Sequence, residues 1–419
     1  MPAANRSRDT DRYALLSKGL LLGWLLVVFA ATLQPGGAED SLGSVTCLVC
    51  GTRGLADAIL NVALFVPLGL ALALTLERPA AALLLAALLS AGIELAQVVL
   101  PGRHPTLGDL VFNTTGALLG ICVARSWSFW LVPAPSPAGR LSLGGSGGAL
   151  VILGLTGFLL GPSLPRSLYF GQWTPDLGHL ERYRGKVSEF TIGPVAIPPR
   201  RLAESDSVRA LLSVGAPIHV EAIAGPPIER LGPLVSVYDD LHREILLIGP
   251  DRGDLVYRYR TRAASLRLDQ PDLRLYGAMG RIEPGDRLQV TLSHGHDGRC
   301  LSLNGTGKCG IGFGVGSGWA TLYYPEIASR SLAGALNALW LALLCLPGAF
   351  WSTGGRLLAR HGLLLVAGFV VIPMFSGLSS VSAVEVLGAA AGVSLGFGLQ
   401  RLLRSRLVPD AGRGMRWSP

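Results

Sequence analysis

Charged side chains are scarce in this chain of 419 residues. Asp, Glu, Lys and Arg make up only 15% of it, whereas half of the residues are hydrophobic and the mean hydropathy is +0.45. A soluble domain carries about 25% charged residues. The scarcity excludes an ordinary soluble enzyme, and the long apolar runs predict a membrane protein.

The few charges are concentrated in one block. Residues 166–330 hold 38 of them in 165 positions, whereas the other 254 residues hold only 26. A block with the charge content of a soluble domain is therefore inserted in an apolar chain. The sequence predicts a polytopic α-helical membrane protein with one large water-facing domain.

Eight stretches are long and apolar enough to span a membrane, which requires about 20 mostly apolar residues. The seventh is short and ends at Pro373, so six or seven spans remain an alternative. The predicted spans are Tyr13–Leu33, Asp57–Leu76, Ala80–Leu100, Leu107–Ala124, Leu143–Leu164, Leu332–Trp351, Leu363–Met374 and Val381–Leu399. The predicted order is a basic tail (1–12), a four-helix membrane domain (13–125), a Pro/Ser linker (126–142), a fifth helix (143–164), the charged block (166–330), C-terminal helices (332–400) and a second basic tail (401–419).

Lys and Arg are distributed unevenly between the two ends of these spans. With the N-terminus inside, 14 of those outside the charged block lie on the cytoplasmic side, and only Arg53 and Arg103 lie in short external loops. This predicts cytoplasmic termini and an extracytoplasmic block. We expect the basic ends to set the topology and to bind anionic lipid, so a pI near 9.4 requires no nucleic-acid partner. A cleaved signal peptide at Tyr13–Leu33 is the alternative, but its apolar core exceeds the usual length of about 7–15 residues.

Cysteine is also rare, with six residues. Two pairs fall on the predicted external face, where disulfides form, and we expect Cys300–Cys309 and, less readily because the loop is small, Cys47–Cys50. A Cys-x-x-Cys motif can also mark redox chemistry or zinc. No second Cys-x-x-Cys pair and no nearby histidine accompany Cys47 and Cys50 in the sequence, so the sequence predicts no metal site and no cofactor.

Ionisable and amide side chains gather near the outer ends of three predicted spans. Such groups are costly in a membrane and usually mark function. Residues one helical turn apart share a face, so we expect these side chains to meet in one ligand-binding pocket. They are Asp57 and Asn61 on the second span, Glu94 and Gln97 on the third, Arg103 in the following loop beside His104, and Asp109 and Asn113 on the fourth.

Structural alternatives exist for part of this set. Asp57 and Asp109 lie in first helical turns, where a carboxylate caps the helix and meets its dipole, and Thr106-x-x-Asp109 resembles a capping box. Glu94 has no such role and requires a partner, for which Arg103 is the obvious candidate. A Glu94–Arg103 ion pair that only holds helices together is therefore the alternative to a ligand site.

The motifs of these spans resemble those of the VanZ-like family over residues 15–125. They read Asp57-x-x-x-Asn61-x-x-x-Phe65-x-Pro67-x-Gly69, then Glu94-x-x-Gln97 with Arg103, then Asp109-x-x-x-Asn113-x-x-Gly116-x-x-x-Gly120. The family is named for a low-level teicoplanin-resistance protein of bacteria. The resemblance implies a multi-pass protein of the bacterial inner membrane and cell envelope, without an established molecular activity.

The C-terminal spans repeat part of this pattern. Glu385-x-x-x-Ala-x-x-Gly392-x-x-x-Gly396 aligns with the motif that begins at Asp109, and Asn337 with Pro347 resembles Asn61 with Pro67 at a longer spacing. A parallel duplication of four helices is one explanation. Close packing of helices through small residues is the other.

The charged block has the pattern of β-strands separated by Gly, Pro and Asp, with a hairpin from Arg243 to Arg260 and no competing helix. It predicts an antiparallel β-sandwich. The strand texture of residues 183–325 resembles concanavalin A-like (laminin G-like) domains. The expected strands begin at Lys186, Ile218, Leu234, Glu244, Leu255 and Arg287.

The polar and aromatic residues of this block leave its chemistry open. It lacks the paired carboxylates of a glycosidase. Asp239-Asp240 and Asp251 with Asp254 are either calcium ligands or solvated turn residues. The aromatic residues either stack on sugars or belong to the core; they are Trp173, Tyr257, Tyr259 and Trp319.

The leading hypothesis is a membrane protein that binds a lipid headgroup, a lipid-linked glycan or a glycopeptide-like ligand, such as a peptidoglycan precursor, at the outer face. The sandwich would contact envelope glycan or protein. A membrane-embedded hydrolase or transferase, with Glu94 or Asp109 as general base, is less favoured because no nucleophile–base pair is visible. A structural envelope scaffold is the third alternative.

Overall fold

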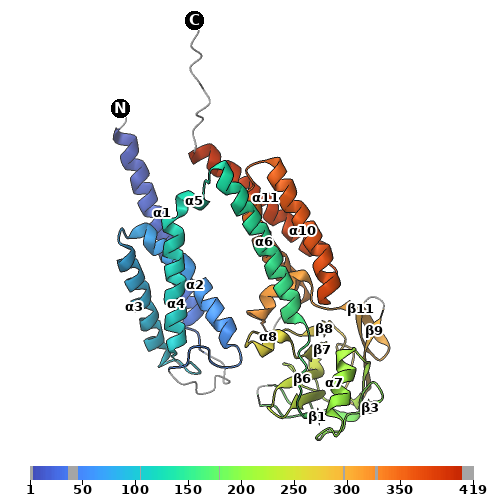
Figure 1. The fold of residues 1–419 in the computed structure, drawn as a ribbon. Coiled ribbons are helices and arrows are strands. Elements are labelled where there is room, and N and C mark those ends of the chain that lie inside the picture. Colours follow the sequence, from blue (N-terminus) through green and yellow to red (C-terminus); the bar gives the residue numbers. More distant parts are fainter. Residues whose placement is uncertain are drawn as a thin grey trace. The chain divides into compact units, whose positions relative to one another are not determined.

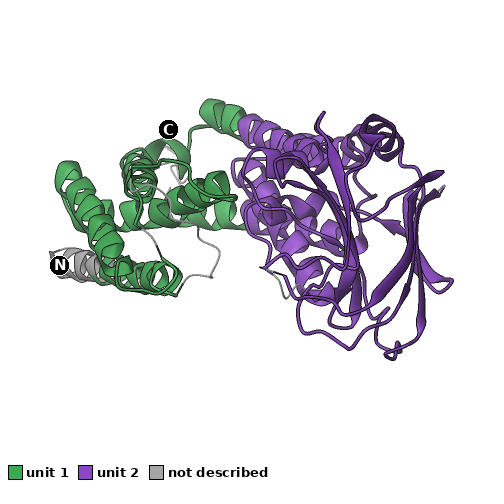
Figure 2. Ribbon diagram, turned by 90° about the horizontal axis from the view of Figure 1, so that it is seen from below, with its two compact units in different colours: residues 1–141, 398–419 green, residues 142–397 purple. Residues whose placement is uncertain are grey.

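The computed structural model describes residues 3–35, 46–103, 105–178, 180–295, 298–325 and 329–407. His104 and most of the C-terminal basic tail lie outside these ranges. The chain divides into two compact units, residues 1–141 with 398–419 and residues 142–397 (Figure 2).

Eight helices of the described chain are long and apolar enough to cross a membrane, as predicted. The seventh is not short, because it starts at Gly355 and continues through Pro373 to Ser376. The eight are α1 (Ala3–Thr32), α2 (Gly54–Thr75), α3 (Pro79–Gln97), α4 (Leu107–Arg125), α6 (Pro135–Leu160), α9 (Arg330–Phe350), α10 (Gly355–Ser376) and α11 (Ala383–Leu407).

Much of the chain that the sequence predicted to be a tail or a linker is helical in the structure. Within residues 126–142, α5 (Trp127–Trp130) is helical and α6 already starts at Pro135. Proline is tolerated in the first turn of a helix because the N–H that it lacks has no helical partner there. At the chain ends, α1 begins at Ala3 and α11 runs to Leu407.

The first unit is held together by close contact between α2 and α4, which lie side by side (Figure 1). A side chain at Gly69 would strike the backbone of Ala117, and one at Gly120 would strike the backbone of Val66. Both helices start at the same end of the unit. Helix α3, which lies between them in the sequence, runs in the opposite direction. Small residues that let backbones touch are the usual means of helix association in membranes.

The second unit carries the predicted β-sandwich, whose two antiparallel sheets face one another in Figure 2. The sheet order is β1-β5-β6-β7-β8 in one and β11-β10-β9-β4-β2-β3 in the other. The first sheet contains β1 (Tyr169–Trp173), β5 (Val235–Asp239), β6 (Glu244–Asp251), β7 (Asp254–Tyr259) and β8 (Leu273–Leu275). The second contains β2 (Lys186–Ile192), β3 (Val195–Ala196), β4 (Ile218–Ile223), β9 (Arg287–Gly295), β10 (Gly298–Leu303) and β11 (Thr306–Ile311).

All six strands expected from the sequence are present, and β6 and β7 form the expected hairpin with Asp251 opposite Asp254. The expectation that the block contains no helix is wrong, because Ser205–Ser213 forms helix α7. Its apolar side chain Val208 is fully buried against the sandwich core. Two further short elements occur, α8 (Arg262–Ser265) and the 3-10 helix η1 (Val315–Thr321).

The sandwich core continues into the helices of its own unit. Side chains from both sheets, such as Val220 and Ile248, share one buried cluster with Leu160 of α6 and Leu341 of α9. The Tyr259 hydroxyl of β7 also donates a hydrogen bond to the Leu160 carbonyl at 3.0 Å. The sandwich is therefore packed onto its membrane helices rather than tethered by a linker.

Both expected disulfides are formed. Cys300 and Cys309 join the neighbouring strands β10 and β11 at the edge of the second sheet. Cys47 and Cys50 close the small loop that precedes α2. The two other cysteines, Cys122 and Cys345, are free thiols.

The position of the sandwich relative to the membrane is open to a direct test. We expect a cysteine at Ser207, an exposed position of α7, to react with an impermeant maleimide in intact spheroplasts, because the charge asymmetry predicts that this block lies outside. A cysteine at Ser405, exposed near the end of α11, should react only after lysis. The reverse pattern would overturn the orientation.

A second prediction concerns the acid stability of the sandwich. Burial alone would raise the pKa of Asp239, but hydrogen bonds from the Arg243 side chain and backbone hold that pKa below its ordinary value. A lowered pKa in the folded state stabilises the fold above the unfolded pKa of about 3.9, and this stability is lost as the pH falls.

Replacing this carboxylate should therefore remove both stability and its pH dependence. We expect Asp239→Asn to cost roughly 2 kcal/mol at pH 7, the value of charged hydrogen bonds, and to flatten the loss of stability below about pH 4. Thermal unfolding of the purified protein between acid and neutral pH measures this. The neighbouring exposed Asp240 provides the control, and an equal effect of Asp240→Asn would contradict the assignment.

Candidate ligand site at the ends of helices α2 to α4

The predicted polar side chains lie at one end of the first unit. Asp57 and Asn61 are in the first two turns of α2, Asp109 and Asn113 are in the first two turns of α4, and Glu94 is in the last turn of α3. The N-termini of α2 and α4 place the positive ends of two helix dipoles beside Asp57 and Asp109. The ends of three helices therefore converge on one acidic region.

Thr106, the residue before α4, connects the two central carboxylates. Its backbone N–H donates to Glu94 Oε2 at 3.0 Å, and its hydroxyl donates to Asp109 Oδ2 at 3.0 Å. Asn61 Nδ2 donates to the other oxygen of Asp109 at 2.6 Å. The structure thus brings Asn61, Glu94 and Asp109 together around Thr106. We call these four residues, together with Arg103 and Asn113, the polar cluster.

Asn113 lies one turn deeper and is only 2% exposed. Its Nδ2 donates to the Ser90 hydroxyl of α3 at 3.0 Å, whereas its Oδ1 is buried and accepts no hydrogen bond from the described residues. A buried acceptor without a partner costs about 1–3 kcal/mol. Such an orphaned atom marks a position where a donor from outside the described chain would be stabilising.

The predicted residues not yet placed are Gln97, Arg103, Asp57 and His104. Gln97 Nε2 donates to the Thr32 carbonyl at 2.8 Å, and Arg103 Nε donates to the Gln34 carbonyl at 3.0 Å, so both connect to the end of α1. Asp57 is exposed. His104 lies outside the described residues.

The expected direct ion pair between Glu94 and Arg103 is not formed. Glu94 accepts the Thr106 backbone N–H, and the Arg103 guanidinium is directed to a carbonyl of the chain after α1. Arg103 remains near enough for its charge to act on both Glu94 and Asp109. A simple Glu94–Arg103 pair therefore does not account for the acidic residue in α3.

A disulfide loop forms one side of the site. The Gly108 N–H in the first turn of α4 donates to the Cys47 carbonyl at 3.2 Å. A side chain at Gly108 would strike the backbone of Leu48, and one at Gly54 would strike the backbone of Val49. The Cys47–Cys50 loop thus packs on the starts of both α2 and α4. The sequence signalled the disulfide but not this role, nor those of Thr106 and Ser90.

The second unit contains the same arrangement between α9 and α11. Ser382 and Glu385 cap α11 as Thr106 and Asp109 cap α4: the Glu385 N–H donates to the Ser382 hydroxyl at 3.3 Å, and that hydroxyl donates to Glu385 Oε2 at 3.0 Å. The Ser382 backbone N–H also donates to Glu385 Oε2, at 2.8 Å. In the first unit, the equivalent Thr106 N–H is taken by Glu94 instead.

The packing below the capping residues fixes the register of α4 against α2 and of α11 against α9. Gly120 lies against the backbone of Val66 and Leu70, and Gly396 lies against the backbone of Leu346 and Phe350. Pro67 and Pro347 each follow the first of these contacts. The spacing is therefore the same in both pairs, which supports a duplication.

This register corrects the alignment expected from the sequence. With Pro347 equivalent to Pro67, Asn337 takes the place of Asp57 rather than of Asn61. Glu385 remains the equivalent of Asp109, as expected.

The equivalent acid in the second unit contacts a segment of the sandwich. The Gly316 N–H of η1 donates to Glu385 Oε1 at 2.9 Å, and the Trp319 indole N–H donates to Asn337 Oδ1 at 2.8 Å. Gly318 packs against Thr156 of α6. The segment η1 thus packs on the starts of α9 and α11, as the Cys47–Cys50 loop packs on the starts of α2 and α4.

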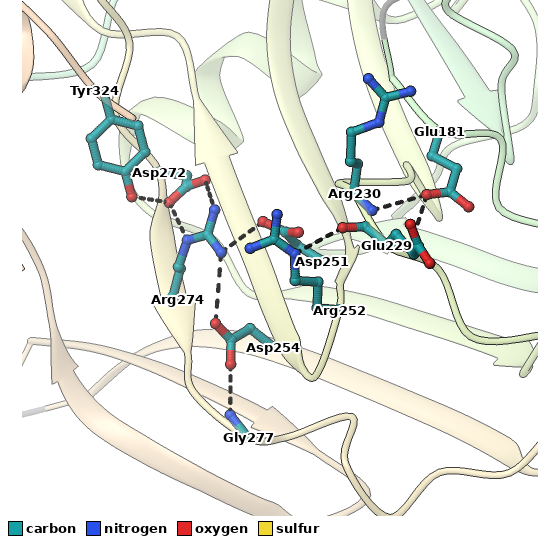
Figure 3. Close-up of polar contacts among 10 residues, drawn as sticks. All are labelled: Glu181, Glu229, Arg230, Asp251, Arg252, Asp254, Asp272, Arg274, Gly277 and Tyr324. Atoms are coloured by element: carbon teal, nitrogen blue, oxygen red, sulfur yellow. Dashed lines mark hydrogen bonds and ion pairs between the residues drawn. The ribbon is translucent and has the colours of Figure 1, made fainter. Parts of the chain in front are cut away.

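Several acidic residues of the sandwich form ion pairs with one arginine. Arg274 lies 2.7 Å from Asp251, 3.6 Å from Asp254 and 2.9 Å from Asp272, and it is almost fully buried (Figure 3). The Tyr324 hydroxyl also donates to Asp272, at 2.5 Å. Arg274 supplies the positive charge at Asp251 and Asp254 that the calcium alternative assigned to a metal ion.

The other acidic pair and the aromatic residues have structural contacts. Asp239 accepts hydrogen bonds from the Leu241 and Arg243 N–H groups and so closes a turn. Tyr257 and Tyr259 are buried in the core. Trp173 donates to the Ile197 carbonyl, and Trp319 donates to Asn337. These aromatic side chains fit the core alternative better than a sugar-stacking surface.

The two capping acids should differ in their contribution to stability. Glu385 is 2% exposed and accepts backbone hydrogen bonds from Gly316 and Ser382, so we expect Glu385→Gln to lower the free energy of unfolding by about 2–3 kcal/mol. The carboxylate of Asp109 accepts hydrogen bonds only from side chains among the described residues, and these can reorient. Asp109→Asn should therefore cost less than half as much. Thermal unfolding in detergent compares them, and equal losses would argue that both acids serve only packing.

Comparison with known proteins concerns the N-terminal part of the chain. A family model described as VanZ/LLP1 matches residues 13–130. No curated protein and no solved structure gave a significant match. The matched residues include the whole polar cluster and the α2–α4 contact, whereas the sandwich lies outside them. The chain therefore carries a VanZ-like membrane domain at residues 13–130.

Proposed function

We propose that this protein binds an amphiphilic ligand of the bacterial cell envelope at the polar cluster, on the outer face of the inner membrane. A lipid headgroup, a lipid-linked glycan or a glycopeptide-like molecule has the required form. Its apolar part would remain in the bilayer, and its hydroxyl, amide or ammonium groups would donate to the cluster.

The observation that carries the proposal is the orphaned Oδ1 of Asn113 beneath two carboxylates on neighbouring helices. A merely structural cluster would be expected to satisfy its buried atoms, because a partly satisfied network is less stable than an apolar core. The Asp109 and Glu94 carboxylates of the cluster accept few hydrogen bonds from the described residues and leave acceptor capacity for a ligand. A donor-rich ligand therefore fits better than an anion.

The topology supports the same side of the membrane for the cluster and the sandwich. The cluster lies at the start of α4, and α6 is the next helix long enough to span. If both cross once, the end of α6 at Leu160, from which the sandwich begins, returns to the side of the cluster. The distribution of Lys and Arg favours the outer side for both.

The sandwich is proposed to contact envelope glycan or protein beside the membrane. Its two antiparallel sheets are compatible with the concanavalin A-like resemblance of its strands. The aromatic side chains of Tyr276 and Tyr323 are exposed on the sandwich, by 39% and 55%, and they are the first positions to examine for glycan contact.

Ligand retention during purification tests the proposal. We expect native mass spectrometry of the protein from mild detergent to detect a bound amphiphile in the wild type, and roughly tenfold lower occupancy in Glu94→Gln and Asp109→Asn, because each change removes a charged acceptor. Glu77→Gln, which alters an exposed acid just beyond the other end of α2, should retain the ligand.

Stability measurements distinguish a ligand site from a cluster that only holds the helices together. If Glu94 served only to balance Arg103, Glu94→Gln would be destabilising and the double change Glu94→Gln with Arg103→Gln would restore stability. We expect Glu94→Gln to melt within a few degrees of the wild type instead. Restoration by the double variant, together with unchanged ligand occupancy, would refute the proposal.

A further inference from the structure

One face of helix α6 is apolar and exposed up to the end of the helix. Val151, Leu155 and Phe158 follow one another at spacings of four and three residues, so they share a face, and each side chain is at least half exposed. Because α6 is long and apolar enough to cross the membrane, lipid acyl chains can pack along this face. The strip of exposed side chains ends at Phe158, two residues before the last residue of α6.

Helix α8 of the sandwich lies against this end of α6 (Figure 1). The Arg262 backbone N–H donates to the Gly161 carbonyl at 2.9 Å, and Arg262 Nη1 donates to the Phe158 carbonyl at 3.2 Å. The Arg262 guanidinium also lies 4.7 Å from the centre of the Phe158 ring, a cation–π contact. A positive charge is thereby fixed at the point where the apolar strip of α6 meets the sandwich.

The chain around α8 is basic. Residues 259–268 read Tyr-Arg-Thr-Arg-Ala-Ala-Ser-Leu-Arg-Leu, with three arginines and no acid. Arg262 and Arg267 are exposed, whereas Arg260 is half-buried and its guanidinium forms no hydrogen bond or ion pair with the described residues. Burial and the neighbouring charge of Arg243 lower the pKa of Arg260. A charge that is partly removed from water without a partner is costly, and an anion would stabilise it.

An exposed leucine accompanies these charges. Leu266 is 48% exposed, and its backbone N–H donates to the Arg262 carbonyl at 3.2 Å, so the two residues lie one helical turn apart on one face. Arginine next to exposed apolar side chains is typical of segments at a membrane surface. The planar guanidinium also matches the geometry of phosphate oxygens. An apolar strip that leads to arginines therefore has the form of a phospholipid.

We propose that α8 and the end of α6 bind an anionic phospholipid of the bilayer that α6 spans. Its phosphate lies on Arg260 and Arg262, and an acyl chain lies along Val151, Leu155 and Phe158. This site belongs to the second unit and takes an anion, so it goes beyond the proposed function and does not depend on the polar cluster. Binding there attaches the sandwich to the membrane surface.

The test uses the full-length protein in phosphatidylcholine nanodiscs that contain a trace of phosphatidylglycerol with a photoreactive headgroup. We expect crosslinks to residues 258–268, mapped by mass spectrometry. Their yield should fall roughly tenfold when Arg260→Gln and Arg262→Gln are combined, because charged hydrogen bonds to phosphate are lost. Arg287→Gln, which alters an exposed arginine of β9, is the matched control and should leave the yield unchanged.

The single change Arg260→Gln guards against a folding defect. Since the Arg260 guanidinium has no partner among the described residues, we expect this variant to unfold at the wild-type temperature in pure phosphatidylcholine and still to lose crosslinks several-fold. An unchanged yield in both the single and the double variant would overturn the proposal.

Changes of the probe test the ligand class without any change in the protein. Phosphatidylcholine that carries the same photoreactive group is neutral overall and should label residues 258–268 several-fold less. Equal labelling by the two lipids would contradict an anionic ligand. Millimolar inorganic phosphate should not compete, because it lacks the acyl chain that the α6 strip holds. Full competition would identify a site for free phosphate and overturn the lipid assignment.

Discussion

The backbone contact between parallel helices is the constraint on which both units depend. Where Gly116 and Gly120 let α4 touch α2, the capping acid of α4 is carried to within hydrogen-bonding distance of Asn61. Larger residues would separate the helices by the width of a side chain and break this contact. The same holds for α9 and α11, where Gly392 and Gly396 bring Glu385 next to Asn337.

The fold was largely predictable because its signals are local. Apolar length identified all eight spans, and alternation with turn residues identified the six central strands. Errors arose where a local signal has two meanings. Pro135 suggested a linker, yet proline is compatible with the first turn of a helix. Pro373 suggested a helix end, yet proline is tolerated in the interior of a membrane helix. Helix α7 was missed because its nine residues are too few for a clear helical period.

The candidate site was predictable in its members but not in its connections. Helical spacing correctly placed Asn61, Glu94 and Asp109 at one end of the unit. Which atoms meet depends on the rotation of each helix about its axis, and no local pattern encodes that rotation. The ion pair expected for Glu94 was therefore replaced by a backbone N–H of Thr106, and the role of Ser90 could not be anticipated.

The hydrogen bond from Gly316 to Glu385 also has a consequence for cooperativity of folding. A buried carboxylate in α11 is satisfied by a segment that exists only when the sandwich is folded. If the sandwich unfolded alone, Glu385 would lose this partner while still next to the bilayer, and the buried cluster shared with Leu160 and Leu341 would open. The sandwich and the membrane helices of this unit are therefore expected to unfold as one cooperative unit. A destabilising change at the far edge of a sheet would then also lower the stability of the helices.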